Sequence, residues 1–186
     1  MLASLSKEMY DPRKMEIFGS LITRRRALKT LVASAVPLSL LKAREPSELP
    51  LHFVAKTVDG DKLSSDSLKG KVVLINFWAT WCPYCKGDER AVERVTKDFE
   101  DKGLVVLSVD MGEPRRKVKK YLEEHPRVSK VVLAEDTTLA AICEAKTYPL
   151  YVLIDRQGDI IGRQHGAAGE DALRRFLTKA GLRDSE

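Results

Sequence analysis

Cysteine is scarce in this chain, with three among 186 residues, which is too few for a fold held together by disulfides. Histidine is equally scarce, and its three copies are isolated from one another (His52, His125 and His165). The longest apolar run covers residues 31–41, shorter than the roughly 20 residues that span a membrane. No internal repeat or low-complexity segment is present, so a repeat array is excluded. The length suits one domain with an appendage.

Excess positive charge is confined to the N-terminal end of the chain. Residues 1–43 carry eight Lys or Arg and three acids, whereas the remaining 24 basic and 24 acidic residues balance. A protein that binds nucleic acid needs a basic surface to meet the phosphates. We therefore expect no nucleic-acid partner.

Residues 23–41 have the order of an export signal, because three arginines (24–26) precede the apolar run and polar residues follow it. The Thr-Arg-Arg start, with leucine and lysine after it, resembles a twin-arginine (Tat) signal. The sequence thus predicts a periplasmic or other extracytoplasmic location. Leu41-Lys42-Ala43 lacks the small residue expected three positions before a cleavage site, and an uncleaved leader would act as a membrane tether. The alternative is a basic amphipathic leader that lies on a membrane surface or stays in the cytosol.

We divide the chain into a leader at 1–43, a linker with two prolines at 44–50 and one domain at 51–186. The domain opens with a predicted hairpin around Asp59-Gly60. Apolar runs of strand length then alternate with segments of helical periodicity, and this β-α-β order predicts parallel strands with a right-handed crossover. Strands are predicted at residues 71–77, 104–109, 128–133, 150–155 and 160–165, and helices at about 82–102, 113–124, 137–144 and 170–179.

Two of the three cysteines, Cys82 and Cys85, stand three apart where an apolar strand gives way to a helix. Residues i and i+3 share a helix face, so the pair can close a disulfide and reopen it. The first helical turn has free backbone N–H groups and the positive end of the helix dipole, which favour a thiolate. Because cysteine chemistry proceeds through the thiolate, Cys82, open to a partner at the helix start, is the predicted nucleophile. Cys85 is the predicted resolving thiol.

The competing interpretation of this pair is half of a structural zinc site. Zinc takes four ligands, and the other candidates, Cys143 and the three histidines, show no second paired spacing. We therefore favour redox chemistry, with no metal and no cofactor beyond the Cys82–Cys85 disulfide. Cys143 stands among apolar residues and is predicted to be a small buried hydrophobe, the alternative being a reactive third thiol.

Three further segments extend the pattern around the cysteines: GKVVLINFWATWC at 70–82, the insert at 110–136, and YPLYVLID at 148–155. With the upstream hairpin, they resemble the extracytoplasmic TlpA/ResA-like thiol:disulfide oxidoreductases of the thioredoxin superfamily. The resemblance covers about residues 51–180. It implies an α/β thioredoxin-like fold, with a central mixed sheet flanked by helices, an N-terminal β-hairpin extension and a central insert.

The same resemblance implies a surface for protein substrates. Pro149 matches the family's cis-proline, which lies beside the cysteine pair and offers backbone groups to an extended substrate. Trp81 matches the tryptophan before the nucleophile, which shapes the docking surface. Pro83, Tyr84 and Tyr148 complete the predicted substrate-binding set, the alternative for Tyr148 being an aromatic side chain packed under a loop. The Pro-Tyr dipeptide between the cysteines is typical of glutaredoxins, so the redox potential is expected to differ from that of the relatives.

Asp88 stands three residues after Cys85, where ResA-like proteins carry a glutamate proposed to handle protons. Exchange needs one thiol at a time to be deprotonated, and Asn76, at the position of the buried aspartate of cytosolic thioredoxins, cannot titrate. Asp88 is therefore the candidate proton acceptor. The alternative is that it only stabilises the helix through the dipole. Arg90 stands where a proline is usual in the family, so the chain departs from the family pattern at the position of the expected helix kink.

The predicted function is thiol:disulfide exchange with protein partners outside the cytoplasm, as a reductant of the cytochrome c maturation type. The protein would be re-reduced by an upstream thiol donor, and we expect a monomer. One alternative is a peroxiredoxin-like peroxidase, although that site needs a threonine three residues before its cysteine and Thr80 stands two before Cys82. The other is a metallochaperone or metal-binding module of the same fold, which normally has a wider cysteine spacing and a distal histidine.

Overall fold

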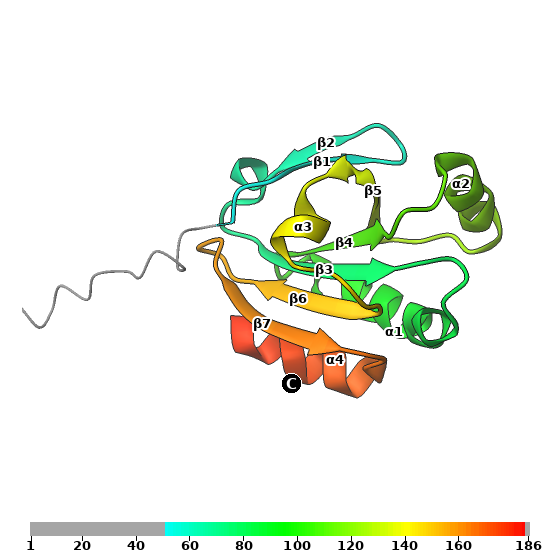
Figure 1. The fold of residues 1–186 in the computed structure, drawn as a ribbon. Helices are drawn as coiled ribbons and strands as arrows, with labels where there is room; N and C mark the ends of the chain where they lie inside the picture. Colours follow the sequence, from blue (N-terminus) through cyan, green and yellow to red (C-terminus); the bar gives the residue numbers. More distant parts are fainter. Residues whose placement is uncertain (1–50, 185–186) are drawn as a thin grey trace, which may run out of the picture. The chain divides into compact units, whose positions relative to one another are not determined.

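The computed structural model describes residues 51–184 (Figure 1). The predicted leader at 1–43 and linker at 44–50 lie outside the described residues and stay predictions. Seven strands form one sheet in the order β2-β1-β5-β4-β3-β6-β7. The strands are β1 (Val54–Thr57), β2 (Lys62–Ser64), β3 (Val72–Trp78), β4 (Leu104–Asp110), β5 (Lys130–Thr137), β6 (Leu150–Ile154) and β7 (Ile160–His165). The α-helices are α1 (Pro83–Glu100), α2 (Arg115–Glu124), α3 (Leu139–Ile142) and α4 (Gly169–Leu177).

The sheet is mixed, as predicted. Strands β3, β4 and β5 are parallel, whereas β6 is antiparallel to β3 and β7 is antiparallel to β6. All seven residues of β3 are buried, which is what its continuous apolar run predicts for a central strand. The hairpin of β1 and β2 also forms as predicted and joins the sheet beside β5. The structure confirms the thioredoxin-like α/β fold.

The largest differences from the predicted boundaries fall at β5 and α3. The sequence predicts that strand β5 ends at residue 133, but it continues to Thr137, which pairs with Ala55 of the hairpin. Helix α3 covers only residues 139–142 of the predicted 137–144. The antiparallel contact with β1 extends the strand into residues that would otherwise begin the helix, and the helix ends before Glu144, whose φ of 51° is left-handed. Helix α1 runs unbroken past Arg90 to Glu100.

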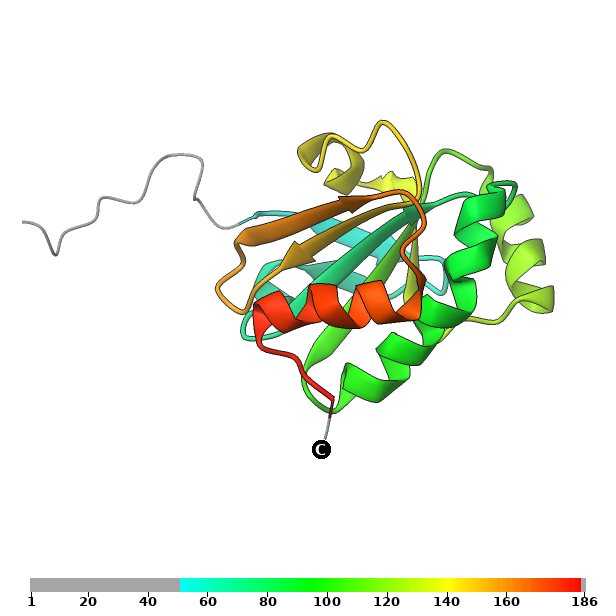
Figure 2. The ribbon, with the colours of Figure 1, turned by 90° about the horizontal axis from the view of Figure 1, so that it is seen from below.

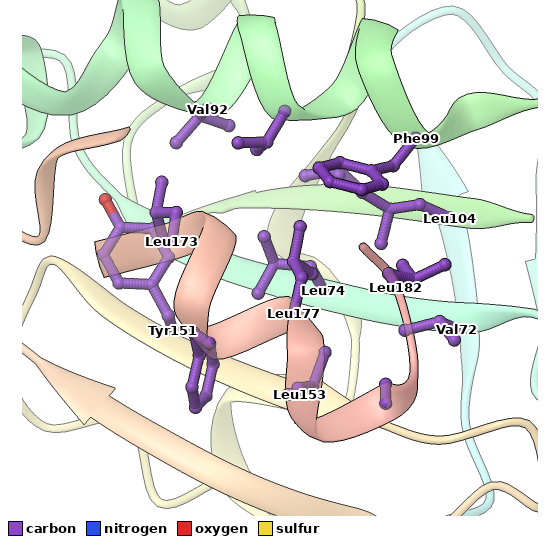
Figure 3. Packing of buried hydrophobic residues seen from close by; sticks show 14 of the residues in the cluster. Val72, Leu74, Val92, Phe99, Leu104, Tyr151, Leu153, Leu173, Leu177 and Leu182 are labelled. Atoms are coloured by element: carbon purple, nitrogen blue, oxygen red, sulfur yellow. The ribbon is translucent and has the colours of Figure 1, made fainter. Parts of the chain in front are cut away.

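Helices α1 and α4 cover one face of the sheet, and Figure 2 shows them lying side by side across it. Their apolar side chains meet those of β3, β4 and β6 in one buried cluster (Figure 3). Its labelled members are Val72, Leu74, Val92, Phe99, Leu104, Tyr151, Leu153, Leu173, Leu177 and Leu182. The alternating residues of β3 point to the other face and pack with α3. Burial on both faces fixes the sheet, so the end of β3 is a rigid base for the cysteine pair.

Cys143 lies at the end of α3, inside the cluster on that second face. Its side chain is 1% exposed, and burial raises the pKa of the thiol to about 11. The prediction of a small buried hydrophobe is confirmed. A thiol that stays protonated and covered at neutral pH is a poor nucleophile, so Cys143 does not provide a third reactive thiol.

Candidate functional site

Cys82 and Cys85 lie directly after β3, where the chain turns into α1. Cys82 is the N-cap residue of this 18-residue helix, and its Sγ accepts a hydrogen bond from the backbone N–H of Cys85 at 3.2 Å. The two sulfurs form a disulfide with the Cα atoms 5.3 Å apart. Pro83 takes the first helical position, where a missing N–H costs nothing. The Cys82 sulfur therefore lies at the positive end of the helix dipole, which stabilises a thiolate once the pair is reduced.

The prediction that Cys82 is open to a partner is wrong for the oxidised form. Cys82 is 3% exposed and Cys85 6% exposed. The Cys82 sulfur is covered because it caps the first turn of α1 and lies 4.0 Å from the carbonyl oxygen of Tyr148. An incoming thiol must therefore approach through the side chains that border the disulfide.

Those bordering side chains are aromatic and exposed. Trp81 is 57% exposed and Tyr84 is 69% exposed, and the Trp81 ring meets the Tyr148 ring edge-on, with centroids 5.4 Å apart. The Tyr148–Pro149 peptide bond is cis. The structure thus brings the Tyr148–Pro149 segment, from a distant part of the chain, to Cys82 and its neighbour Trp81. Pro83 and Tyr84 adjoin them because they lie between the two cysteines.

Asp88 lies on the inner face of α1 and is only 5% exposed. Both oxygens of its carboxylate are occupied: they accept the Tyr151 hydroxyl at 2.8 Å and the backbone N–H groups of Ala168 and Gly169 at 2.6 and 2.9 Å. Burial, followed by the hydrogen bond to Asp88, raises the pKa of Tyr151, so that the hydroxyl stays a donor. Asp88 therefore joins α1 to β6 and to the start of α4. Its role as a proton acceptor stays a prediction.

Replacing Asp88 with asparagine should lower the free energy of unfolding by about 2–3 kcal/mol. The amide has one acceptor oxygen for three donors, and its NH₂ group would face a buried donor that loses its partner. The measurement is urea unfolding of the oxidised protein. Asp98→Asn on the same helix is the matched control, because its partly exposed ion pair with Arg174 is worth at most about 1 kcal/mol. Equal losses in the two variants would contradict the structural role of Asp88.

Two carboxyl groups outside the predicted site are connected by hydrogen bonds to the loop between β3 and Cys82. Asp110 ends β4 as the register partner of Trp78 and is fully buried, and its Oδ1 accepts the backbone N–H of Glu113 at 2.9 Å. The carboxylate of Glu113 accepts both the N–H and the hydroxyl of Thr80, at 2.5 and 2.7 Å. The ammonium group of Lys117 lies 2.6 Å from the same carboxylate. The available signal was the parallel pairing of the two predicted strands, because the residues that follow such strands, Trp78 and Asp110, lie at the same edge of the sheet.

The pKa values of the two carboxyl groups are shifted in opposite directions. Burial raises the pKa of Asp110 to about 7, and the neighbouring Glu113 carboxylate adds to the effect. Burial also acts to raise the pKa of Glu113, but the hydrogen bonds from Lys117 and Thr80 outweigh it and the pKa is lowered. At neutral pH Glu113 is therefore ionised, while Asp110 is near the midpoint of its titration.

Metal-binding clusters and membrane-spanning helices are both absent from the described part of the chain. Within residues 51–184, no group of three or more His, Cys, Asp or Glu side chains has the arrangement that holds a metal ion. No helix in the same residues is long and apolar enough to cross a membrane.

Similarity to known proteins agrees with this geometry. The profile of the AhpC/TSA family matches residues 48–174. The chain belongs to this family of thioredoxin-like proteins. Thiol-disulfide oxidoreductase ResA of Bacillus subtilis (strain 168) is 26% identical over 159 residues, which cover 86% of this chain and 88% of that protein. ResA of a Bacillus cereus strain is also 26% identical, over 128 residues covering 69% and 74% of the two chains.

Solved structures of the same class superpose on the domain. A thiol:disulfide interchange protein of the thioredoxin family from Chlorobium tepidum TLS has a TM-score of 0.64 at 28% identity, covering 72% of this chain and 96% of that one. StoA from Bacillus subtilis shares the fold, with a TM-score of 0.61 at 20% identity over 70% of this chain and 98% of that one. The chain is thus a thiol–disulfide oxidoreductase of the ResA/thioredoxin type, with Cys82 and Cys85 as its redox-active pair. The predicted family and enzyme class are confirmed.

Proposed function

We propose that this oxidoreductase reduces disulfides in protein partners outside the cytoplasm, in a process of the cytochrome c maturation type. The observation that carries the proposal is the position of Cys82, at a helix N-terminus and against the cis Tyr148–Pro149 segment. The resemblance to ResA-like proteins favours the reducing direction. An upstream thiol donor is then needed to restore the dithiol after each turnover.

The exchange proceeds in two steps, each of which conserves atoms and electrons. The Cys82 thiolate attacks one sulfur of the partner's disulfide, that S–S bond breaks, and the departing sulfur leaves as a thiolate that takes up a proton. Cys85 then loses its proton and attacks the Cys82 sulfur, which forms the Cys82–Cys85 disulfide and releases the partner's second thiolate. Two electrons pass from the cysteine pair to the partner. Asp88, three residues after Cys85, is our candidate for accepting the Cys85 proton.

The partner is proposed to bind as an extended segment along Pro149. Trp81 and Tyr84 are the most exposed aromatic side chains beside the disulfide, and large aromatic side chains give contact area at a low entropy cost. Tyr148 supports the Trp81 ring from one edge. With Pro83 between the cysteines, these residues form our candidate docking surface for a polypeptide.

Export through the leader at residues 1–43 is part of the same proposal. Its support is the order of basic and apolar residues together with the ResA-like relatives, and an uncleaved leader would tether the domain to the membrane. We expect the domain to act as a monomer, because one chain supplies both cysteines and the surrounding surface.

A peroxidase is the second candidate, since peroxiredoxins share this fold. The hydroxyl of Thr80, however, donates to Glu113 at 2.7 Å, and the Cys82 sulfur is already paired with Cys85. Both observations favour exchange with a disulfide. Steady consumption of hydrogen peroxide by the reduced protein, at a rate above that of disulfide reduction, would favour the peroxidase instead.

The direction of exchange is tested by the reduction potential of the Cys82–Cys85 pair. Equilibration with glutathione buffers should give a value between thioredoxin's, about −270 mV, and the roughly −200 mV of the glutaredoxins that share the Pro-Tyr dipeptide, far from the roughly −120 mV of a strong oxidant such as DsbA. The Cys143→Ala variant should give the same value, because that thiol is buried on the other face of the sheet. A potential near that of the oxidant would contradict the reductant proposal while leaving the exchange chemistry intact.

A further inference from the structure

We propose that Asp110 and Glu113 form a buried acid pair that positions the loop carrying Cys82 and makes its reactivity depend on pH. Neither residue touches the sulfur, so both are positioning residues. The inference rests on thiol–disulfide exchange at Cys82, but it does not depend on the direction of electron flow or on the partner.

The positioning runs through a short series of hydrogen bonds. Asp110 holds the backbone of Glu113 through the 2.9 Å bond to its N–H, and Glu113 in turn holds Thr80 by two bonds, to the N–H and to the hydroxyl. Thr80 lies inside the turn that the Cys82 N–H closes onto the carbonyl of Ala79, at 3.2 Å. The segment after β4 thus fixes the loop after β3 just before the nucleophile.

A second contact makes this connection rigid. The backbone N–H of Met111 donates to the carbonyl of Trp78 at 2.9 Å, so the β4 segment also extends the pairing with β3 past its last register pair. Movement of Glu113 relative to Asp110 would therefore displace Thr80 and, two residues later, Cys82.

Charge explains why the two carboxyl groups share one proton. Lys117 supplies a single positive charge to the pair, so two ionised carboxylates would leave one buried negative charge uncompensated. The Oδ2 atom of Asp110 is buried and has no hydrogen-bond partner, which is costly for a carboxylate oxygen. A proton on Oδ2 turns it into a donor to the Glu113 carboxylate, which is how two close carboxyl groups usually avoid repulsion. The raised pKa of Asp110 and the lowered pKa of Glu113 agree with this arrangement.

The groups facing Asp110 come from several elements. Glu113 lies on the segment after β4, and Lys117 comes from α2. Its register partners, Trp78 on β3 and Leu133 on β5, do not titrate. From the start of α1, the titratable groups that share the apolar cluster with Trp78 and Leu133 are Cys82 and Cys85, and Tyr121 and Tyr148 pack against the same cluster. The guanidinium group of Arg127 lies 3.9 Å from the centroid of the Trp78 ring.

Raising the pH through the titration of Asp110 should therefore act on Cys82 in two ways. The new negative charge repels the Glu113 carboxylate and disturbs its hold on Thr80. It also disfavours the Cys82 thiolate, because a like charge nearby opposes ionisation. The reactivity of Cys82 should rise less steeply with pH than that of a cysteine without such a neighbour.

The first test is the backbone amide of Thr80 in the oxidised full chain, followed by NMR from about pH 5 to 9. Cys82 and Cys85 are joined as a disulfide and cannot titrate, so a shift of this amide with a midpoint near 7 reports the acid pair. Asp110→Asn keeps an acceptor for the Glu113 N–H and a donor toward its carboxylate but does not titrate. The midpoint should disappear in this variant.

The matched control is Asp155→Asn at the opposite end of β6 from Pro149. The Asp155 carboxylate likewise accepts backbone N–H groups two and four residues later, from Gln157 and Asp159. It should leave the Thr80 titration unchanged. A Thr80 shift that persists in Asp110→Asn would assign the titration to another group, such as a histidine, and would overturn the proposal.

The second test is alkylation of reduced Cys82 by iodoacetamide, resolved by peptide mass spectrometry. The rate of the wild type against pH should need one titration more than that of Asp110→Asn, which should react several-fold faster at about pH 8. Superimposable profiles would overturn the coupling to Cys82. If Asp110→Asn does not fold, the wild-type protein still tests the proposal, because a Thr80 amide that does not shift with pH excludes the acid pair. If the Thr80 amide titrates as expected but the protein does not catalyse thiol–disulfide exchange, the proposed function is wrong and the acid pair stands.

Discussion

Replacing Cys82 with serine should lower the rate at which insulin disulfides are reduced by more than about a thousandfold, to the uncatalysed rate of the assay buffer. A hydroxyl at the helix N-terminus is not ionised at neutral pH and cannot attack a disulfide sulfur, since exchange proceeds through a thiolate. Cys85 is not expected to substitute, because Cys82 is the N-cap residue of α1, whose sulfur accepts the Cys85 N–H, whereas Cys85 lies within the helix. The measurement is the insulin turbidity assay with dithiothreitol as donor.

Variants of the two remaining cysteines distinguish the loss of the nucleophile from general damage to the protein. Cys85→Ser should still attack a disulfide but should stop at the mixed disulfide, because no thiol is left to resolve it. Cys143→Ala should retain wild-type turnover, as expected for a buried thiol on the far face of the sheet. Wild-type activity in Cys82→Ser, or a large loss in Cys143→Ala, would contradict these assignments.

The stability of the oxidised protein should fall as the pH rises from about 5 to 8, and Asp110 should cause up to about 3 kcal/mol of that loss. An acid whose pKa is raised in the folded state, here from 3.8 to about 7, binds its proton more tightly when folded. Its stabilising contribution is complete below the unfolded pKa and is lost as the pH passes the folded one. Glu113, with its lowered pKa, acts in the opposite sense and loses its contribution only as the solution becomes more acidic.

Asp110→Asn isolates this contribution. Its free energy of unfolding in urea, subtracted from that of the wild type, should change by up to about 3 kcal/mol between about pH 5 and 8, with the variant gaining relative stability at the higher pH. Asp155→Asn, whose native carboxylate accepts the backbone N–H groups of a turn, is the control and should give a difference that does not vary with pH over that range. A pH-independent difference for Asp110→Asn would mean that its carboxyl is ionised throughout.

The fold could be predicted because its main signals are local. The apolar run of β3 and the period of α1 each follow from a few consecutive residues, and the β-α-β order determines the parallel pairing. The end of β5 could not be predicted, because Thr137 becomes part of a strand only through its contact with Ala55, far away in sequence.

The site was predictable only where the chain itself places the residues. Cys82 and Cys85 share a helix turn, and the resemblance to a known family located Trp81 and Pro149. The three hydrogen bonds of Asp88 depend on α4 and β6, and the hold of Glu113 on Thr80 joins residues 33 positions apart. The burial of Cys82 likewise depends on Tyr148, so it could not follow from the helix position alone.

The most direct measurement is the identity of the sulfur that carries a trapped partner. Reduced Cys85→Ser protein is mixed with insulin, quenched with acid and digested, and the mixed disulfide is located by mass spectrometry. We predict the adduct on Cys82 and none in the matching Cys82→Ser experiment. An adduct on Cys143, or no adduct from either variant, would contradict Cys82 as the nucleophile.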